Sequence, residues 1–288
     1  MDRRDGSVSA GGRGSDAWRR LIRDRAAMVG GWCTLALVLM ALFAPAIAPY
    51  DPIKVNMRER LQGPTAKHLL GTDQFGRDIL SRIVHGTRIS LTVGLISVGI
   101  GLGVGTTLGL LAGFYRRLDY PITALMDVLL SFPQILLAIA IVAALGPGIF
   151  NAMIAVGIGA VPAFTRLTRS SVLSIREHDY VEAARALGAS NPRIILRYVL
   201  PNCFSPLVIL GTLSLATAIL AAAILSFLGL GARPPMPEWG AMAAEGRGFI
   251  AQFPHIATFP SLAIFVVVLC FNLLGDGLRD ALDPRLKE

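Results

Sequence analysis

Four residues that could act as acids or bases lie close together after the first long apolar stretch: His68, Asp73, Asp78 and His85. Carboxylates and imidazoles held near one another can move protons to and from a substrate, so a hydrolase or transferase is one interpretation. The other interpretation is structural, because glycines are frequent here and Asp78 can cap a helix over residues 79–84. Both interpretations stay open at this point.

The sequence lacks the signatures by which a chain binds nucleotide or metal on its own. A Walker A loop requires Gly-Lys-Ser/Thr, and none of the three lysines has that context: Lys54, Lys67 and Lys287. The histidines show no His-x-x-x-His spacing and the cysteines no Cys-x-x-Cys spacing. We therefore predict no metal site and no cofactor bound by this chain, and we expect Cys33, Cys203 and Cys270 to pack as small apolar residues.

A polar stretch with the sequence EAARALGASNPRIILRYVLP, residues 182–201, is flanked by long apolar stretches. Good helix formers precede Gly188, which can end a first helix. A second helix can begin with Ser190 or Asn191 as its cap and Pro192 in its first turn. The stretch therefore predicts an elbow, made of a helix, a bend and a second helix.

The second helix of the elbow is predicted to have two distinct faces. Arg193 and Arg197 line one face. The apolar residues recur on the other: Ile194, Ile195, Tyr198 and Val199. Such an elbow can dock into a groove of a partner protein. The alternative is a solvated loop that only connects two spans.

The elements that carry these residues are predicted to be membrane-spanning helices. Of 288 residues, 53% are hydrophobic and 16% are charged, against about 25% charged in soluble proteins. Five stretches without Asp, Glu, Lys or Arg are long enough to cross a bilayer: 26–50, 89–115, 128–165, 198–232 and 248–275. Gly146-Pro147-Gly148 is typical of a tight turn and divides the third stretch into two spans, the second of them short. The predicted fold is all-α, a polytopic membrane protein with six transmembrane helices.

Basic residues predict the orientation, because they concentrate on the cytoplasmic side of membrane proteins. With the N-terminus inside, the inner segments hold 18 of the 27 Lys and Arg residues and the outer segments hold nine. Both termini and the elbow are then cytoplasmic. Arginine-rich inner loops beside anionic lipid also explain the net charge of +8, so we expect no nucleic-acid partner.

Four sequence blocks resemble, in the same order, the permease subunits of the dipeptide/oligopeptide/nickel family of ATP-binding cassette (ABC) importers. The blocks are LLGTDQFGRDILSRIVHGTRISL (69–91), SFPQILLAIAIVAALGPG (131–148), YVEAARALGAS (180–190) with Leu200-Pro201, and NLLGDGLRDALDPRL (272–286). The third block resembles the family's cytoplasmic EAA loop. The resemblance covers nearly everything after about residue 28. It implies a type I ABC importer permease fold in the cytoplasmic membrane of a prokaryote.

In the resembled family, the EAA loop inserts into a cleft of an ATP-hydrolysing subunit, so that closure of the ATPase dimer moves the membrane helices. By this resemblance four residues are expected to couple the permease to its ATPase: Glu182, Ala183, Ala184 and Gly188. The acidic side chain can pair with a cation of the partner, the alanines permit close approach, and the glycine permits the bend.

The resemblance also implies the remaining components of the complex. These are a second homologous permease subunit, two ABC ATPase subunits that hold ATP and Mg, an extracytoplasmic substrate-binding protein, and the surrounding membrane lipid. The chain itself is then expected to be a transport subunit and not an enzyme. Peptide is the favoured cargo, with nickel or another small solute as the alternative within the family.

Asp127 bears on a further alternative, a self-sufficient secondary carrier. Carriers need ion-coupling carboxylates in mid-span, and Asp127 alone approaches such a position. We expect it either to pair with an arginine near the cytoplasmic face or to line the pathway. Pro133 and Pro162 are expected to kink spans three and four.

Small residues recur at every fourth position of span two: Ser97, Gly101, Gly105, Gly109 and Gly113. They predict a face for close helix packing, which is either a static seam or one that slides during alternating access. The hydrophobic segment 229–255, which includes Trp239, is expected to lie against the membrane surface or a partner permease.

These predictions divide the chain into five parts. A cytoplasmic tail (1–28) is followed by the first transmembrane helix (29–49), an outer loop (50–85), a core of five helices (86–276) and a cytoplasmic tail (277–288). The coupling loop occupies about residues 170–202 of the core.

Overall fold

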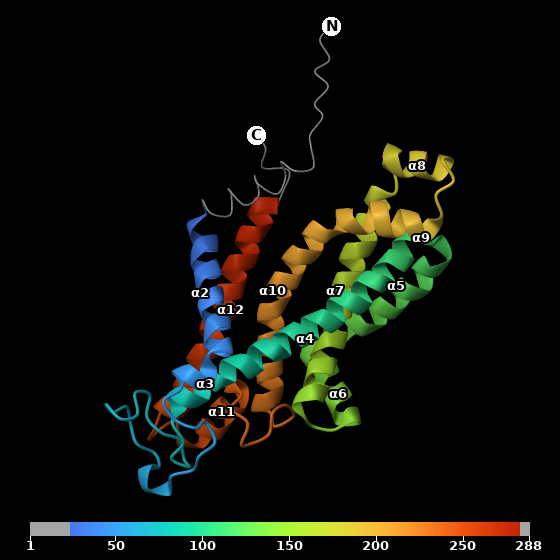
Figure 1. Cartoon of the computed structure of the whole chain (residues 1–288). Coiled ribbons are helices and arrows are strands. Elements are labelled where there is room, and N and C mark those ends of the chain that lie inside the picture. Colours follow the sequence, from blue (N-terminus) through green and yellow to red (C-terminus); the bar gives the residue numbers. More distant parts are fainter. Residues whose placement is uncertain (1–23, 283–288) are drawn as a thin grey trace.

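A computed structural model describes residues 24–282, whose long elements are all α-helices (Figure 1). In chain order the elements are α2 (Arg25–Leu42), α3 (Ala44–Ile47), η1 (Met57–Glu59), α4 (Ile79–Phe114), α5 (Arg116–Ser131), α6 (Gln134–Leu145), α7 (Ile149–Ile175), α8 (Asp179–Ala186), α9 (Asn191–Ile194), η2 (Ile195–Val199), α10 (Leu200–Phe227), α11 (Trp239–Gly246), η3 (Arg247–Phe249) and α12 (His255–Leu282). Most of the predicted N-terminal tail and half of the C-terminal tail lie outside the described residues.

Within residues 24–282, five helical segments are long and apolar enough to cross a membrane: α2, α4, α7, the run α9–α10 (Asn191–Phe227) and α12. The helices α5 and α6 pass the same test together but are bent by 95° relative to each other. The predicted all-α fold with six spans is confirmed, with the third span as a broken pair.

The break in the third span follows from Pro133. We expected a single helix up to the turn at Gly146, but α5 ends before Phe132 and α6 starts after Pro133. Proline has no N–H for the preceding turn and forces extended backbone on the residue before it, and Phe132 has a ψ of 135°. The proline expected to kink this span therefore separates two helices, whereas Pro162 lies inside an unbroken α7.

Other helix ends also differ from the predicted spans. The first span ends at Leu42, because the chain turns at Phe43 and Pro45 starts the short α3. The fourth span is not short, since α7 continues past the uncharged stretch for 27 residues in all. The last span begins at His255, after a short 3₁₀ turn. In each case we placed the end where the charges stop, whereas a helix ends where backbone geometry changes.

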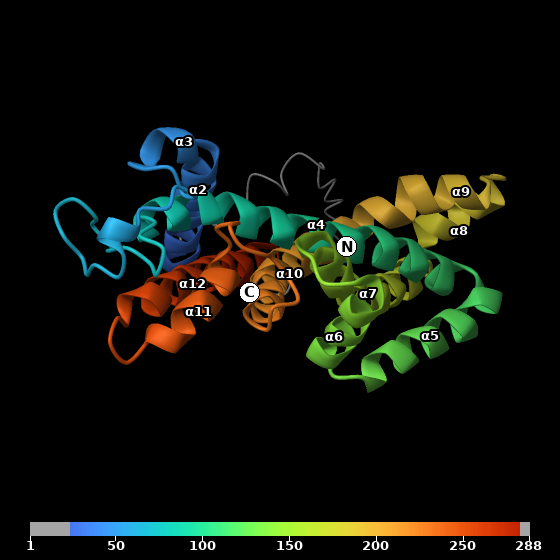
Figure 2. The ribbon, with the colours of Figure 1, turned by 90° about the horizontal axis from the view of Figure 1, so that it is seen from below.

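The long helix α4 joins two groups of helices. Seen from below, it runs across the molecule from α2, α3 and α12 at one end to α5, α6 and α7 at the other, with α10 between them (Figure 2). One hydrophobic cluster contains Phe164 and Val172 of α7, and the second contains Trp239 of α11 with Phe271 of α12. The position of α4 places the elbow at one end of a continuous helical framework.

The segment between α10 and α12 packs inside the chain rather than outside it. We expected Trp239 to lie against membrane or a partner, but its side chain is buried and its Nε1 donates to the carbonyl of Ile83 at 3.1 Å. The Glu238 carboxylate caps α11 by accepting from two backbone amides, and burial raises its pKa. The hydrophobic residues of α11 therefore belong to the core, whereas Met236 and Ile250 on either side of it are exposed.

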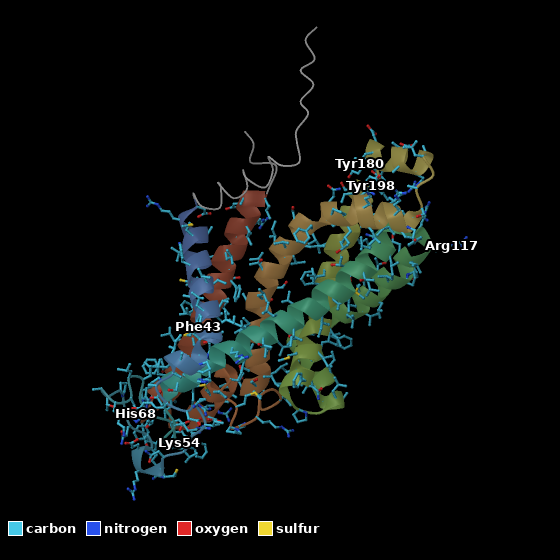
Figure 3. All side chains as sticks on the ribbon, in the orientation of Figure 1. Phe43, Lys54, His68, Arg117, Tyr180 and Tyr198 are labelled. Atoms are coloured by element: carbon cyan, nitrogen blue, oxygen red, sulfur yellow. The ribbon has the colours of Figure 1, made fainter. Side chains whose placement is uncertain are left out.

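The elbow lies on the same side of the molecule as the start of α2 and the end of α12 (Figure 1). Arg117, Tyr180 and Tyr198 lie toward this side, whereas Lys54 and His68 lie at the opposite end (Figure 3). The arrangement agrees with the orientation that the basic residues predict, and the assignment of this side to the cytoplasm stays a prediction.

Candidate functional site

The elbow is formed by α8, a glycine turn and the run of α9, η2 and α10. Its bend is a Schellman motif, in which the Gly188 amide donates to the Arg185 carbonyl and the Ala189 amide to the Ala184 carbonyl, both at 3.0 Å. Gly188 has φ of +80° with no atom within 4 Å of a built Cβ. Left-handed backbone is costly for most residues with a Cβ, so glycine is favoured here for its conformation and not for lack of space.

Apolar side chains from both arms close the inside of the elbow. Val181 and Ala184 of α8 are buried together with Ile194 and Val199 of the second arm. The predicted two-faced helix is therefore present, with its apolar face turned toward α8 and the core. Ala184 faces inward and is buried, whereas Ala183 is exposed, and their expected contact with a partner stays a prediction.

The outward face of α8 presents Glu182 and Ala183, both exposed, and Leu187, which is 88% exposed. The sequence reasoning missed Leu187 because it was counted only as a helix former. Its position directly before the helix-ending glycine was the available signal, since a residue at a helix end that projects from a turn has few neighbours to cover it. Single exposed apolar side chains are normal on protein surfaces, so Leu187 is accessible to a partner but does not by itself mark a contact.

Aromatic rings line the base of the elbow. The ring of Tyr180 lies 5.5 Å from that of His178 and 6.5 Å from that of Tyr198, measured between centroids. Tyr180 and Tyr198 stand close together in Figure 3. Burial raises the pKa of Tyr180, with a smaller contribution from the nearby Cys203. Tyr180 is therefore a neutral packing group that lies beside Tyr198 between the two arms.

The second arm of the elbow is continuous with a membrane span. Residues Ile195–Val199 form a π-helical turn, and the helix then runs without a break from Asn191 to Phe227. Pro201 has no N–H to give to the carbonyl four residues earlier, and wider turns often accommodate such a lost bond. We predicted a second elbow helix and a span beginning at residue 198, and the structure joins the two in one helical run.

Four glycines at every fourth position of α4 face α7. A Cβ built at Gly105 would lie 2.6 Å from the Phe164 Cβ, and one built at Gly109 would lie 2.5 Å from the Thr168 Cβ. Gly101 and Gly113 meet α7 in the same way, with nearest atoms at 2.8 and 2.7 Å. These residues let the two backbones approach, so α7, which leads into the elbow, is held closely against α4.

Two ion pairs connect α5 to α7. Asp119 forms a two-pronged contact with Arg169, at 2.5 and 2.7 Å. Asp127 pairs with Arg166, its Oδ1 lying 2.6 Å from Nη2. The sequence suggested an arginine near the inner face as one partner for Asp127, and Arg166 occupies that position.

The four acid–base residues in the segment before α4 (residues 50–78, the outer segment) and in the first turns of α4 do not converge on one site. The Asp78 carboxylate caps α4 by accepting from the Ser81 amide at 2.8 Å and also contacts the His68 ring at 2.9 Å. Asp73 instead pairs with Arg77, and His85 contacts the carbonyl of Ser81. These partners favour the structural interpretation, in which the residues hold the outer segment onto α4.

A separate pair on the outer segment is exposed to solvent. The Lys67 ammonium donates to the Glu59 carboxylate, and this hydrogen bond, with one from His68, lowers the pKa of Glu59. Among the described residues there is no group of three or more His, Cys, Asp or Glu side chains arranged to hold a metal ion.

Family models match most of the chain. Residues 105–288 match the binding-protein-dependent transport system inner membrane component, and residues 12–64 match the N-terminal transmembrane domain of oligopeptide transport permease C.

Curated relatives match the chain over nearly its whole length. The dipeptide transport system permease protein DppC of Alkalihalophilus pseudofirmus is 50% identical over 273 residues, which are 94% of this chain and 90% of the relative. The glutathione transport system permease protein GsiD of Pectobacterium atrosepticum is 50% identical over 286 residues, 99% of this chain and 94% of the relative. The di/tripeptide transport system permease protein DppC of Pseudomonas aeruginosa is 49% identical over 94% of this chain and 91% of the relative.

Solved structures share the fold at lower identity. A chain of the inward-facing MetNI methionine ABC transporter aligns with a TM-score of 0.59 and 22% identity, over 70% of this chain and 97% of that one. A chain of an amino acid ABC transporter with histidines aligns with a TM-score of 0.52 and 17% identity, over 68% and 92%. The arrangement of helices is therefore that of ABC importer permeases.

Proposed function

This chain belongs to the family of binding-protein-dependent transport system inner membrane components, and we propose that it is the peptide-translocating permease subunit of an ATP-driven importer. Relatives at 49–50% identity are named for dipeptides, di/tripeptides and glutathione, and glutathione is itself a tripeptide. These names favour a short peptide as the cargo.

The observation that carries the proposed mechanism is the unbroken connection from the elbow into α10. Glu182, Ala183 and Leu187 form an exposed face on α8, and the Gly188 turn holds that face away from the rest of the chain. We infer that this face docks on an ATPase subunit. Closure of two such subunits on ATP would push the elbow, and α10 and α7 would carry the movement into the span region.

The complete complex is proposed to contain a second homologous permease, two ATPase subunits that bind ATP and Mg, and an extracytoplasmic binding protein. The exposed apolar surfaces of α5 and α6 suit contact with lipid or a second permease. The chain itself then performs no hydrolysis. The elbow and both termini are proposed to face the cytoplasm, which places the outer segment 50–78 on the side of the binding protein.

Purification of the tagged chain from its native membrane, with identification of the proteins that accompany it, tests this function. We expect a second permease and ATPase subunits. Gly188→Val should lose the ATPase subunits, because a β-branched residue is strained at φ of +80°. Gly188→Asn is the matched control and should keep them, since Asn enters this region readily. A wild-type chain that transports peptide with no ATPase attached would contradict the proposal.

A further inference from the structure

The pair Asp127–Arg166 occupies an unusual place on the surface of this chain. Its side chains are 64% and 57% exposed, although both belong to helices that make up membrane spans. If α7 begins at one edge of a hydrocarbon core about 30 Å thick, Arg166 lies about 26 Å along it, toward the inner edge. Because charges that face lipid are costly, an exposed pair at this depth faces water or protein.

The residues around the pair support contact with water. On α7, Ala163 and Ser170 lie one turn to either side of Arg166 and are exposed. Ser131 lies one turn beyond Asp127 on α5 and is also exposed. Exposed apolar side chains at the end of α5 also lie near the pair, namely Val128 and Phe132, whereas the exposed surface of α2 consists mainly of large apolar side chains: Trp32, Leu35, Val38, Leu39 and Leu42. Lipid suits the surface of α2, and an aqueous pathway suits the face around Arg166.

The pair is not needed to hold α5 against α7. Asp119 and Arg169 already tie these helices by a two-pronged contact, and their side chains are only 28% and 32% exposed. The Asp127–Arg166 pair has one contact and is twice as exposed. Exposed ion pairs contribute about 0–1 kcal/mol, so each charge can exchange its partner at little cost.

Building on the proposed function, we propose that Asp127 and Arg166 line the inner half of the pathway and bind the two charged ends of a short peptide. The Asp127 carboxylate accepts from the peptide ammonium. The Arg166 guanidinium donates to the peptide carboxylate, for which its planar fork is suited. The internal pair opens when the cargo arrives and re-forms when it leaves, so neither charge is left without a partner.

Thiol labelling tests the pathway directly in the assembled complex. A charged, membrane-impermeant thiol reagent should modify Ala163→Cys and leave Leu35→Cys of α2 unmodified. The unaltered chain gives the background, with Cys203 and Cys270 buried and Cys33 of α2 partly exposed. Millimolar dipeptide should slow modification of Ala163→Cys. Failure to label this position, both without nucleotide and with ATP, would overturn the proposal.

Uptake by neutral variants tests the binding role. Asp127→Asn and Arg166→Gln should each reduce dipeptide uptake about tenfold, the loss expected for one charge-assisted contact. Both should still co-purify with ATPase subunits, because Asp119 and Arg169 hold the helices. Dipeptide uptake equal to that of the wild type would overturn the role of the pair. Absence of ATPase subunits from the wild-type complex would instead contradict the proposed function. Labelling of Ala163→Cys would still show whether this face is open to water.

Discussion

Adding one methyl group should have opposite effects at two glycines of α4, because the space around them differs. A Cβ at Gly109 would lie 2.5 Å from the Thr168 Cβ and 2.6 Å from the Thr165 carbonyl oxygen, whereas one at Gly103 would meet nothing within 4 Å. We predict that Gly109→Ala lowers the free energy of unfolding by about 1–3 kcal/mol through overpacking. Gly103→Ala should raise it by up to about 1 kcal/mol, since alanine favours helix. Thermal unfolding of both purified variants measures the difference, and equal midpoints would refute a close α4–α7 seam.

Replacing Leu187 should weaken association with an ATPase subunit without changing the stability of the isolated chain. Its side chain is 88% exposed, so Leu187→Asp should leave the thermal unfolding of the isolated chain unchanged. If an ATPase subunit covers this side chain, a buried charge at the contact should cost at least about 2 kcal/mol and weaken association about 30-fold. Titration of purified ATPase onto the chain in detergent measures this affinity. Unchanged affinity would place the contact elsewhere on α8.

The roles of residues that are set by the adjacent sequence could be predicted, whereas roles that depend on tertiary neighbours could not. Gly188 follows from helix-ending chemistry, and Asp78 follows from capping, so both could be assigned from the adjacent sequence. Ala183 and Ala184 are identical in type, and only the packing of the second arm decides that Ala184 is buried. The partner of Asp127 could be named as an arginine but not as Arg166, because the register between α5 and α7 comes from tertiary contacts.

At the scale of elements, the outer segment is attached to the helices by a buried cluster of charges. The Glu245 carboxylate of α11 contacts Arg77 at 2.6 Å and Arg82 at 3.4 Å, and both arginine side chains are at most 3% exposed. Glu245→Gln would leave Asp73 alone to neutralise two buried guanidinium groups. We predict a loss of about 3–5 kcal/mol in the free energy of unfolding, as for other broken buried pairs.

Lys67→Ala is the matched control for this cluster. It removes an ion pair with Glu59 whose lysine side chain is 57% exposed, so the stability should change little. Denaturant unfolding of the two variants in the same detergent allows the comparison. Equal effects would show that the outer segment is held by something other than the charges of α11.

The number and type of elements followed from the sequence more readily than their shapes. Uncharged stretches located every span, because the bilayer excludes charge whatever the tertiary contacts. Pro133 indicated a kink, but a local rule sets no angle, and the 95° bend depends on how α6 packs on α7. The continuity of α9 with α10 agrees with the predicted span from residue 198, but the π-helical turn at Ile195–Val199 has no signal in the local sequence pattern.

At the scale of the whole molecule, residues at the elbow and residues near Lys54 are predicted to be labelled from opposite sides of the membrane. The elbow and the ends of α2 and α12 share one side, and Lys54 lies on the other (Figure 3). Val55 lies beside Lys54 and is 55% exposed. In the variant Val55→Cys, the new thiol should react with an impermeant thiol reagent added outside intact cells. Leu187→Cys should react only in inverted membrane vesicles, because the basic residues place the elbow inside.

The same pair of variants separates orientation from assembly. In inverted vesicles, Leu187→Cys should be labelled when the chain is produced alone and protected when the ATPase subunits are produced with it, because docking removes the side chain from water. Val55→Cys should be labelled outside cells in both cases, since the ATPase subunits act on the opposite face. Labelling of Leu187→Cys from outside intact cells would reverse the orientation. Labelling in vesicles that is insensitive to the ATPase would keep the orientation but remove Leu187 from the docking surface.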